Sequence, residues 1–384
     1  MWRPTMLRRV TLPLIKENTT ISRLLYSTKS RAPRSTVKLT LISASVGILV
    51  GAGYGGYTHY KINTKKLSGQ TENEEFAYLK EAPAYKSNYK VINEADTSNL
   101  QLVLFQYQTC PFCCKVRAYL DARGISYEIV EVDAVLRQAI KWSGYKKVPI
   151  LLAKVDGGYQ TLLDSSAILS ILETYLRDKT YSLQDIVKFY PLSKFENDSG
   201  KTTTDVTNKY FIMHNSPVPD EKQRNLETEE REWRQWADKV LVHTLSPNVY
   251  RTARESLETF KWFEEAGGWR QTFPGWECAL MVYVGAAAMW LIAKRLKARH
   301  NIQDDVRQSL YDAVNDWMDV IHKKGTPFFG GNSPNLADIS VYGILSSIEG
   351  CTAFHDLRDN TEIGKWFDNM KNSMKETRGR MLAV

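Results

Sequence analysis

The chain has 384 residues, too many for one small domain and enough for two domains with additional segments. Its net charge of +8 is not spread evenly, because nine of the 51 basic residues and only one of the 43 acidic residues precede Leu39. The remaining chain carries 42 residues of each sign, so the part expected to fold has no excess charge for a phosphate backbone. We therefore expect no nucleic-acid partner.

The first 60 residues have the composition of a targeting leader followed by a membrane anchor. Residues 1–38 are rich in Arg, Ser and Thr, with Glu17 as their single acidic residue, which favours a mitochondrial transit peptide over a disordered tail with a chance positive bias. Residues 39–60 carry no charge and are long enough to cross a bilayer once. We therefore predict a single-pass protein of a mitochondrial membrane, joined to its folded part by a polar tether at 61–98.

From residue 99 to residue 177 the pattern is typical of a thioredoxin/glutaredoxin-like α/β domain. Its strands and helices are predicted in the order β-α-β-α-β-β-α, starting with two parallel strands and their crossover helix. Gly124 is expected to end that helix. The predicted elements are a strand at 102–107, a helix after Cys110, a strand at 127–132, a short helix at 136–142, strands at 147–152 and 159–162, and a helix at 167–176.

The second half of the chain is predicted to be all-α. Residues 178–224 have few periodic apolar residues and are expected to be a long connection, followed by a helical domain at 225–384. A helical domain after a thioredoxin-like domain resembles the C-terminal domain of glutathione transferases. One face of the first helix in this half of the chain should carry Trp233, Trp236, Val240 and Thr244. Residues 279–293 are strongly apolar but short, so we expect a buried core helix there and not a second membrane span. Helices are predicted at 254–265, 276–299, 303–323, 336–348 and 361–377.

The chemistry is concentrated at Cys110-Pro111-Phe112-Cys113, between a predicted strand and a predicted helix. Backbone N–H groups and the helix dipole stabilise a thiolate at a helix start, so we predict that Cys110 is the nucleophile. Cys113 either resolves a mixed disulfide or tunes its neighbour, and Cys114 is expected in the core. No further cysteine or histidine pair at matching spacing completes a zinc site, so no metal is expected.

Three further features suit a tripeptide thiol such as glutathione. Val148-Pro149 stands where thioredoxin-like folds have a cis-proline beside the thiol, and Val148 could pair with an extended peptide. Asp164 and Ser165 open a helix that suits the two charged groups of a γ-glutamyl end, although an ordinary helix cap is the alternative. Tyr107 could hydrogen-bond the Cys110 thiolate or simply pack.

Polar residues in the helical half have less specific interpretations. The segment 335–338 is a variant capping box, which is a folding signal and not a site. His243 with Ser246, and Arg295 with Arg299, are polar groups on otherwise apolar helices. Each pair either lies on a solvated face or contacts a ligand.

Six blocks of sequence resemble the membrane-associated prostaglandin E synthase type 2 family, from about Asn99 to the C-terminus. They are 107–113, 147–151, 163–166, 241–251, 285–289 and 334–338. The resemblance implies isomerisation of prostaglandin H2 to prostaglandin E2, a homodimer, and Golgi or cytosolic (perinuclear, after anchor cleavage) forms as alternative locations. It makes Tyr107 a partner of Cys110, and implies glutathione with a haem that can join it in the cleft. The cofactor-binding residues so implied are Phe112, Val148, Pro149, Asp164, Ser165, His243, Ser246, Arg295 and Arg299.

The predicted mechanism uses the thiol. The Cys110 thiolate, or that of bound glutathione, attacks one endoperoxide oxygen, and a base then removes the adjacent C–H proton. A ketone and a hydroxyl result, the thiol is regenerated, and Tyr107 holds the thiolate or donates to the developing alkoxide. Two other functions would use the same residues: a glutathione-dependent thiol oxidoreductase or transferase that depends on Cys113, and a non-catalytic haem- and glutathione-binding membrane protein.

Overall fold

The computed structural model of the chain describes residues 76–196, 202–213, 220–299 and 305–384. All of them belong to one unit, Glu74–Val384. The predicted leader, the predicted membrane span and the first part of the predicted tether lie outside the described residues.

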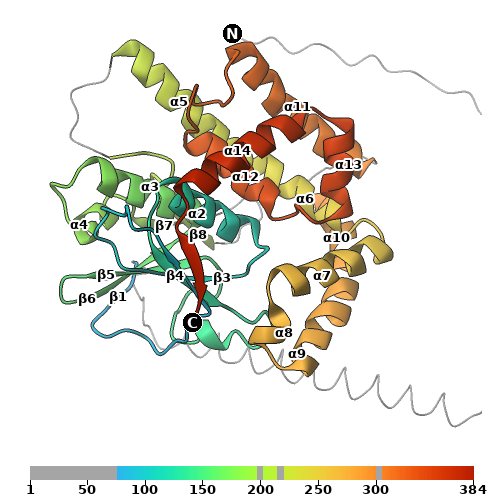
Figure 1. The fold of residues 1–384 in the computed structure, drawn as a ribbon, viewed down its shortest axis with the longest axis horizontal. Coiled ribbons are helices and arrows are strands. Elements are labelled where there is room, and N and C mark those ends of the chain that lie inside the picture. The colour runs from blue at the N-terminus through green and yellow to red at the C-terminus, as the bar shows by residue number, and fades with distance from the viewer. Residues whose placement is uncertain (1–75, 197–201, 214–219, 300–304) are drawn as a thin grey trace, which may run out of the picture. The chain divides into compact units, whose positions relative to one another are not determined.

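A mixed seven-stranded sheet is the framework of the N-terminal half of this unit (Figure 1). The strand order is β1-β6-β5-β3-β4-β2-β9, in which β3 and β4 are parallel and the other neighbours are antiparallel. The strands are β1 (Tyr78–Leu79), β2 (Tyr89–Ile92), β3 (Leu102–Gln106), β4 (Tyr127–Glu131), β5 (Ile150–Val155), β6 (Gly158–Leu163) and β9 (Arg380–Ala383). The four central strands, β6, β5, β3 and β4, are the four predicted from the sequence, which confirms the thioredoxin/glutaredoxin-like domain.

Strand β3 is buried along its whole length and therefore contributes to two cores. Side chains alternate between the faces of a strand, so Leu102 and Leu104 enter the first core, whereas Val103 and Phe105 enter the second. The first core also holds the apolar faces of α2 (Pro111–Ala122) and α3 (Ser165–Arg177). The second core contains Cys113 and Val148, so it is the core that borders the thiol motif.

Local signals set the ends of these elements. Gly124 follows α2 with a φ of +61°, a left-handed conformation that glycine adopts without strain, and the helix ends as predicted. The short helix predicted at 136–142 is a single 3-10 turn, η1 (Gln138–Ile140).

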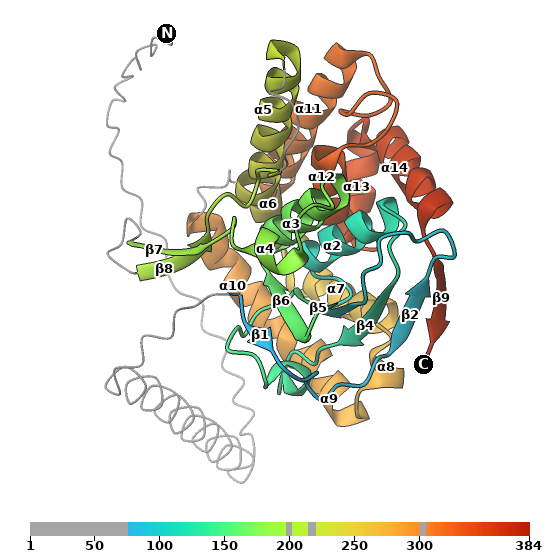
Figure 2. The same cartoon turned by 90° about the vertical axis from the view of Figure 1, so that its left-hand side faces the viewer.

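The segments predicted as a tether and as a long connection contain regular elements that contribute to the fold. The predicted tether supplies β1 and β2, and β2 also pairs with β9 from the C-terminus. The predicted connection contains α4 (Leu183–Val187) and a hairpin of β7 (Leu192–Glu196) and β8 (Thr202–Val206), which forms a second small sheet (Figure 2). These elements were not predicted, because short strands and a five-residue helix have too few residues for a clear period.

The rest of the unit is helical, as predicted. Its helices are α5 (Glu221–Trp236), α6 (Val242–Val249), α7 (Ala253–Ala266), α8 (Trp269–Thr272), α9 (Gly275–Ala279), α10 (Gly285–Arg299), α11 (Val306–Lys324), α12 (Leu336–Ser346), α13 (Thr352–Asn360) and α14 (Ile363–Thr377). Of these, α12 and α14 pack on the side of the sheet that α2 and α3 cover (Figure 2). The predicted capping box starts α12, with Asn335 and Asp338 each accepting the expected backbone N–H. The prediction omitted α8 and α13.

A π-helical turn, η2 (Ala237–Leu241), separates α5 from α6. Such a turn inserts an extra residue and rotates the side chains that follow it. Val240, predicted on the same helical face as Trp233, Trp236 and Thr244, is therefore 43% exposed, whereas Thr244 is buried. The prediction for Val240 was wrong because it assumed an uninterrupted period of 3.6 residues.

The apolar segment at 279–293 is not the buried core helix that was predicted. It is built from α9, a second π-helical turn η3 (Leu280–Val284) and α10, and only 33% of its most apolar window is buried. Large side chains that are more than half exposed lie along it: Trp276, Tyr283, Val284 and Leu291. Among the described residues, Gly275–Lys297 is the helix whose length and composition would allow a membrane crossing, a criterion that a helix of a soluble protein can also meet.

Candidate active site

Cys110 occupies the N-cap of α2, where the chain turns from β3 into the helix. Its amide donates to the carbonyl of Tyr107 at 3.1 Å, and its own carbonyl accepts from the amide of Cys114 at 2.8 Å. Cys110 is half-buried, whereas Cys113 and Cys114 are buried. A partly accessible thiol therefore stands at a helix start, one turn before a buried thiol.

The two thiols of the Cys-x-x-Cys motif have opposite acid–base properties. The pKa of Cys110 is lowered, chiefly because the Cys113 thiol donates a hydrogen bond to it, and the Arg117 charge acts in the same direction against the effect of burial. Burial raises the pKa of Cys113 well above its usual range, and its hydrogen bond to Cys110 adds to this. Cys110 is therefore the more acidic thiol and the better nucleophile.

Arg117 holds the loop that precedes the thiol. Its Nη2 donates to the Gln108 carbonyl at 2.6 Å and to Cys114 Sγ at 3.1 Å, and its Nη1 donates to the Gln106 side chain. Gln106 Nε2 then donates to Glu131 Oε1 at 2.6 Å. Burial raises the pKa of Glu131 to about 7, although the Gln106 hydrogen bond and the Arg117 charge oppose this. The loop thus rests on a buried polar chain that ends in a carboxyl group.

Most of the residues predicted around the thiol are brought together by the second core. Tyr107 and Cys110 border this core, and Val148 lies within it. The Val148–Pro149 peptide is cis, as predicted. Burial raises the pKa of Tyr107, so this tyrosine keeps its proton near the thiols. Phe112 is the exception, because its ring packs against the first core.

Tyr145 lies beside the thiol motif and was not predicted from the sequence. It borders the same core as Tyr107. Its pKa is raised by burial and then by the charges of Asp164, Cys113 and Cys110, which places it within electrostatic range of all three groups. Its only signal in the sequence is an aromatic residue shortly before the cis-proline, which is too weak to separate it from a packing residue.

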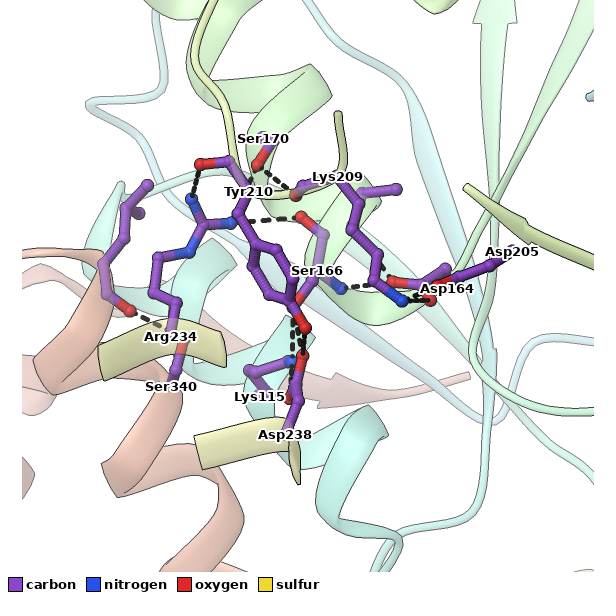
Figure 3. A network of polar contacts seen from close by, with 12 residues as sticks. Lys115, Asp164, Ser166, Ser170, Asp205, Lys209, Tyr210, Arg234, Asp238 and Ser340 are labelled. Carbon is purple, nitrogen blue, oxygen red and sulfur yellow. Dashed lines mark hydrogen bonds and ion pairs between the residues drawn. The ribbon is translucent and has the colours of Figure 1, made fainter. Parts of the chain in front are cut away.

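The turn from β6 into α3 has an unusual backbone. Asp164 has a φ of +64°, uncommon outside glycine and often found at functional sites. Its Oδ1 accepts from the amides of Ser166 and Ala167 at 2.9 and 3.2 Å, so the ordinary helix cap is present (Figure 3). Ser165 is buried, and neither its amide nor its hydroxyl bonds to another described residue. Two donors at a helix N-terminus are therefore available to an anionic group.

The first pair of predicted residues in the helical half lies on one helix, α6. His243 and Ser246 are both half-buried and stand one turn apart on α6. Tyr250 follows one turn later, and its pKa is raised by burial and then by the charges of Cys351 and Cys110. Tyr250 was not predicted, although the spacing of these three residues puts them on one face of a helix.

The second pair gives less support to the predicted site. Arg295 is exposed on α10. The side chain of Arg299 lies outside the described residues. Among the residues that the structure describes, no group of three His, Cys, Asp or Glu side chains is arranged to hold a metal ion.

Comparisons with known proteins identify the family of this chain. The Glutaredoxin family model matches residues 102–157. "Prostaglandin E synthase 2" of mouse (Mus musculus) is 47% identical over 282 residues, covering 73% of this chain and 72% of its own length. The zebrafish (Danio rerio) protein of that name is 43% identical over 327 residues, covering 85% and 80%. The solved structure of the beta-etherase LigF from a Sphingobium strain has a TM-score of 0.40 and 17% identity, covering 72% of this chain and 98% of its own. The chain belongs to the prostaglandin E synthase 2 family.

Proposed function

We propose that this chain isomerises prostaglandin H2 to prostaglandin E2 and that Cys110 is the reacting thiol. The observation that carries the mechanism is the lowered pKa of a partly accessible Cys110 at the start of α2. The family named by the two relatives supplies the reaction class. The aromatic and aliphatic side chains beside the thiol, among them Tyr107, Tyr145 and Val148, suit a lipid substrate.

The reaction proceeds without net oxidation or reduction. The thiolate attacks one endoperoxide oxygen, which forms an S–O bond and breaks the O–O bond, and the other oxygen leaves as an alkoxide. Tyr107, which burial keeps protonated, donates its proton to this alkoxide. The resulting phenolate removes the proton from the carbon that carries the S–O group. The C=O bond forms, the S–O bond breaks, and both the thiolate and the tyrosine are restored.

Glutathione is proposed as the bound thiol cofactor. Its γ-glutamyl carboxylate fits the free amide and hydroxyl of Ser165, and its backbone fits beside the cis peptide of Val148 and Pro149. Bound there, glutathione would supply a second thiolate near Cys110.

Haem is proposed on the resemblance alone. Of the residues so implied, His243 and Ser246 line one face of α6, but Arg295 is exposed. A Soret band in the purified protein that shifts on addition of glutathione is the expected observation, and no reaction step depends on it.

The test of the isomerase is product analysis after adding prostaglandin H2 to the purified full chain in detergent. The full chain is used because truncation at residue 99 would delete β1 and β2. Wild-type protein is expected to give prostaglandin E2, Cys110→Ser to give only background product, and Cys114→Ser, which alters a buried neighbour, to retain activity. Equal background product from all three proteins would exclude the isomerase.

A thiol oxidoreductase is the second candidate, favoured by the hydrogen bond between the Cys113 and Cys110 thiols. A buried thiol in that position can resolve a mixed disulfide on its neighbour. Reduction of a glutathionylated peptide that requires both cysteines would support it. The isomerase reaction, in contrast, requires Cys110, and the Cys113→Ser variant is expected to retain isomerase activity.

We further infer that the chain is anchored in a mitochondrial membrane by residues 39–60, as the basic leader and the uncharged segment suggest. Membrane fractions from cells that express the tagged full chain are expected to contain it, and a chain lacking residues 1–60 should be absent from them. Recovery with Golgi markers would favour the alternative location.

A homodimer is proposed on the exposed apolar surface of α9–α10, which a second copy would cover. Val284→Glu is expected to convert the dimer to a monomer in analytical ultracentrifugation. A matched change at another exposed valine, Val135→Glu, should leave the dimer intact.

A further inference from the structure

The segment that follows β8 brings a lysine to the start of α3. Lys209 Nζ lies 2.6 Å from Asp205 Oδ1 and 3.4 Å from Asp164 Oδ2, with only 17% of its side chain exposed (Figure 3). Its backbone is fixed, because its carbonyl accepts from Ser170 Oγ at 2.6 Å and the next carbonyl, that of Tyr210, accepts from a buried arginine. The lysine is therefore held beside the N-terminus of α3 by the fold and not only by its charge.

One ammonium group is shared here by two carboxylates, those of Asp164 and Asp205. The contact from Lys209 to Asp164 is long, whereas the contact to Asp205 is short. An ammonium group has three donors, so the two contacts leave at least one of them. A ligand that brings both an ammonium and a carboxylate would give Asp164 a closer cation and would use the remaining lysine donor.

The free end of a γ-glutamyl group has these two charges on one carbon. Its carboxylate would lie between Lys209 Nζ and the free amide of Ser165, and its ammonium would contact Asp164 and Asp205. Leu163, the residue before Asp164, and Tyr145 both border the second core, which contains Cys113, so this end of α3 and the thiol belong to the same region.

We propose that Lys209 and Asp205, delivered by the segment after the β7–β8 hairpin, form a specificity site for the γ-glutamyl end of the thiol cofactor. This inference rests on the proposed binding of glutathione. It adds residues from outside the thioredoxin-like strands and helices to the binding site. The alternative is that Lys209 and Asp205 form only an i,i+4 ion pair on a solvated surface. Such a pair would not require Lys209 to be buried or to approach a second carboxylate.

The test compares two thiols by calorimetry on the full chain in detergent: glutathione, and cysteinylglycine, which lacks the γ-glutamyl group. Wild-type protein is expected to bind glutathione more tightly. Lys209→Met should weaken glutathione binding roughly ten- to hundredfold, because that is the typical contribution of one hydrogen bond between charged groups. The Kd for cysteinylglycine should stay within about twofold of the wild-type value. Lys209→Arg should restore most of the affinity. Lys188→Met, at an exposed lysine of α4 that pairs with Asp185, is the control.

The possible outcomes distinguish the proposed glutathione site from the proposed specificity site at Lys209. If wild-type protein binds neither thiol, the proposed glutathione site itself is wrong. If wild-type protein binds glutathione and Lys209→Met binds it equally or more tightly, the specificity site is wrong while glutathione binding stands. An equal loss for both thiols would mean a structural role for the lysine and would also overturn the inference. If Lys209→Met does not fold, Asp205→Asn, a change at a partly exposed residue, replaces it in the test. This variant is expected to weaken the binding of glutathione and not that of cysteinylglycine, and equal binding of glutathione by this variant and the wild type would overturn the inference.

Discussion

Lys115 Nζ donates to Asp238 Oδ1 at 2.5 Å and so joins the helix that carries the thiols to the π-helical turn η2. Lys115 also donates to Ser166 Oγ at 2.8 Å, and Ser166 Oγ donates to Asp238 Oδ2 at 2.6 Å (Figure 3). The lysine side chain is fully buried. Three segments that are far apart in the sequence are therefore tied at one point, and two of them carry Cys110 and Ser165.

Removal of this lysine is expected to be strongly destabilising. Lys115→Met leaves the Asp238 carboxylate buried without its cation, which typically costs about 3–5 kcal/mol. Lys115→Met combined with Asp238→Leu should recover part of this loss, because no unpaired charge is left. Urea unfolding of the single and double variants measures both effects, and a double variant as unstable as the sum of two single ones would contradict the explanation. Lys188→Met should leave the unfolding midpoint unchanged.

The close approach of α12 to α2 depends on Gly343. A Cβ atom there would lie 2.4 Å from the Cα atom and 2.7 Å from the backbone nitrogen of Lys115, and neither backbone atom can move alone. Gly343→Ala is therefore expected to destabilise the protein by about 1–3 kcal/mol, despite the better helix propensity of alanine. Gly144→Ala, where a Cβ would meet no atom within 4 Å, is the control for thermal unfolding. Equal melting temperatures for the two variants would argue against this contact.

The acidity of Cys110 should depend on a hydrogen-bond donor at position 113. Cys113→Ala removes the thiol that lowers the Cys110 pKa most, so the pKa should rise and alkylation near neutral pH should slow. Cys113→Ser keeps a donor and should stay closer to wild type. The measurement is the rate of iodoacetamide reaction against pH. If the alanine and serine variants have the same midpoint as wild type, the hydrogen bond does not control the thiol.

Glu131 should make stability fall as pH rises through the weakly acidic range. Its pKa is raised from 4.5 to about 7 in the folded chain, so the folded state binds more protons than the unfolded state between these values. The free energy of unfolding therefore decreases from about pH 4.5 to about pH 7, by up to roughly 3 kcal/mol from this group. Glu131→Gln lacks the titration, and its stability relative to wild type should rise across that window in urea unfolding. Parallel pH profiles for the two proteins would show that the carboxyl is not perturbed.

Much of the site could be predicted because its signals are local. The strand, the Cys-x-x-Cys turn and the helix after Cys110 lie within about 20 consecutive residues, and the cis peptide before Pro149 and the capping box at Asn335 also depend on a few neighbours. Tyr145, Tyr250 and Lys209 were missed because their roles come from elements elsewhere in the chain. The sequence around an aromatic or basic residue does not indicate which side chains that residue will contact in the folded protein.

The sequence alone determined the order of the central strands and helices, the thiol motif at a helix start and the family of the chain, because these depend on short-range patterns and matching blocks. Tertiary structure decided the rest. It placed β2 and β9 side by side, exposed Val240 by a π-helical turn, left one face of α9–α10 uncovered and set Lys115 against Asp238. Each of these features depends on which distant segment packs against a residue, and hydrophobic periodicity indicates that a residue will be buried but not what will cover it.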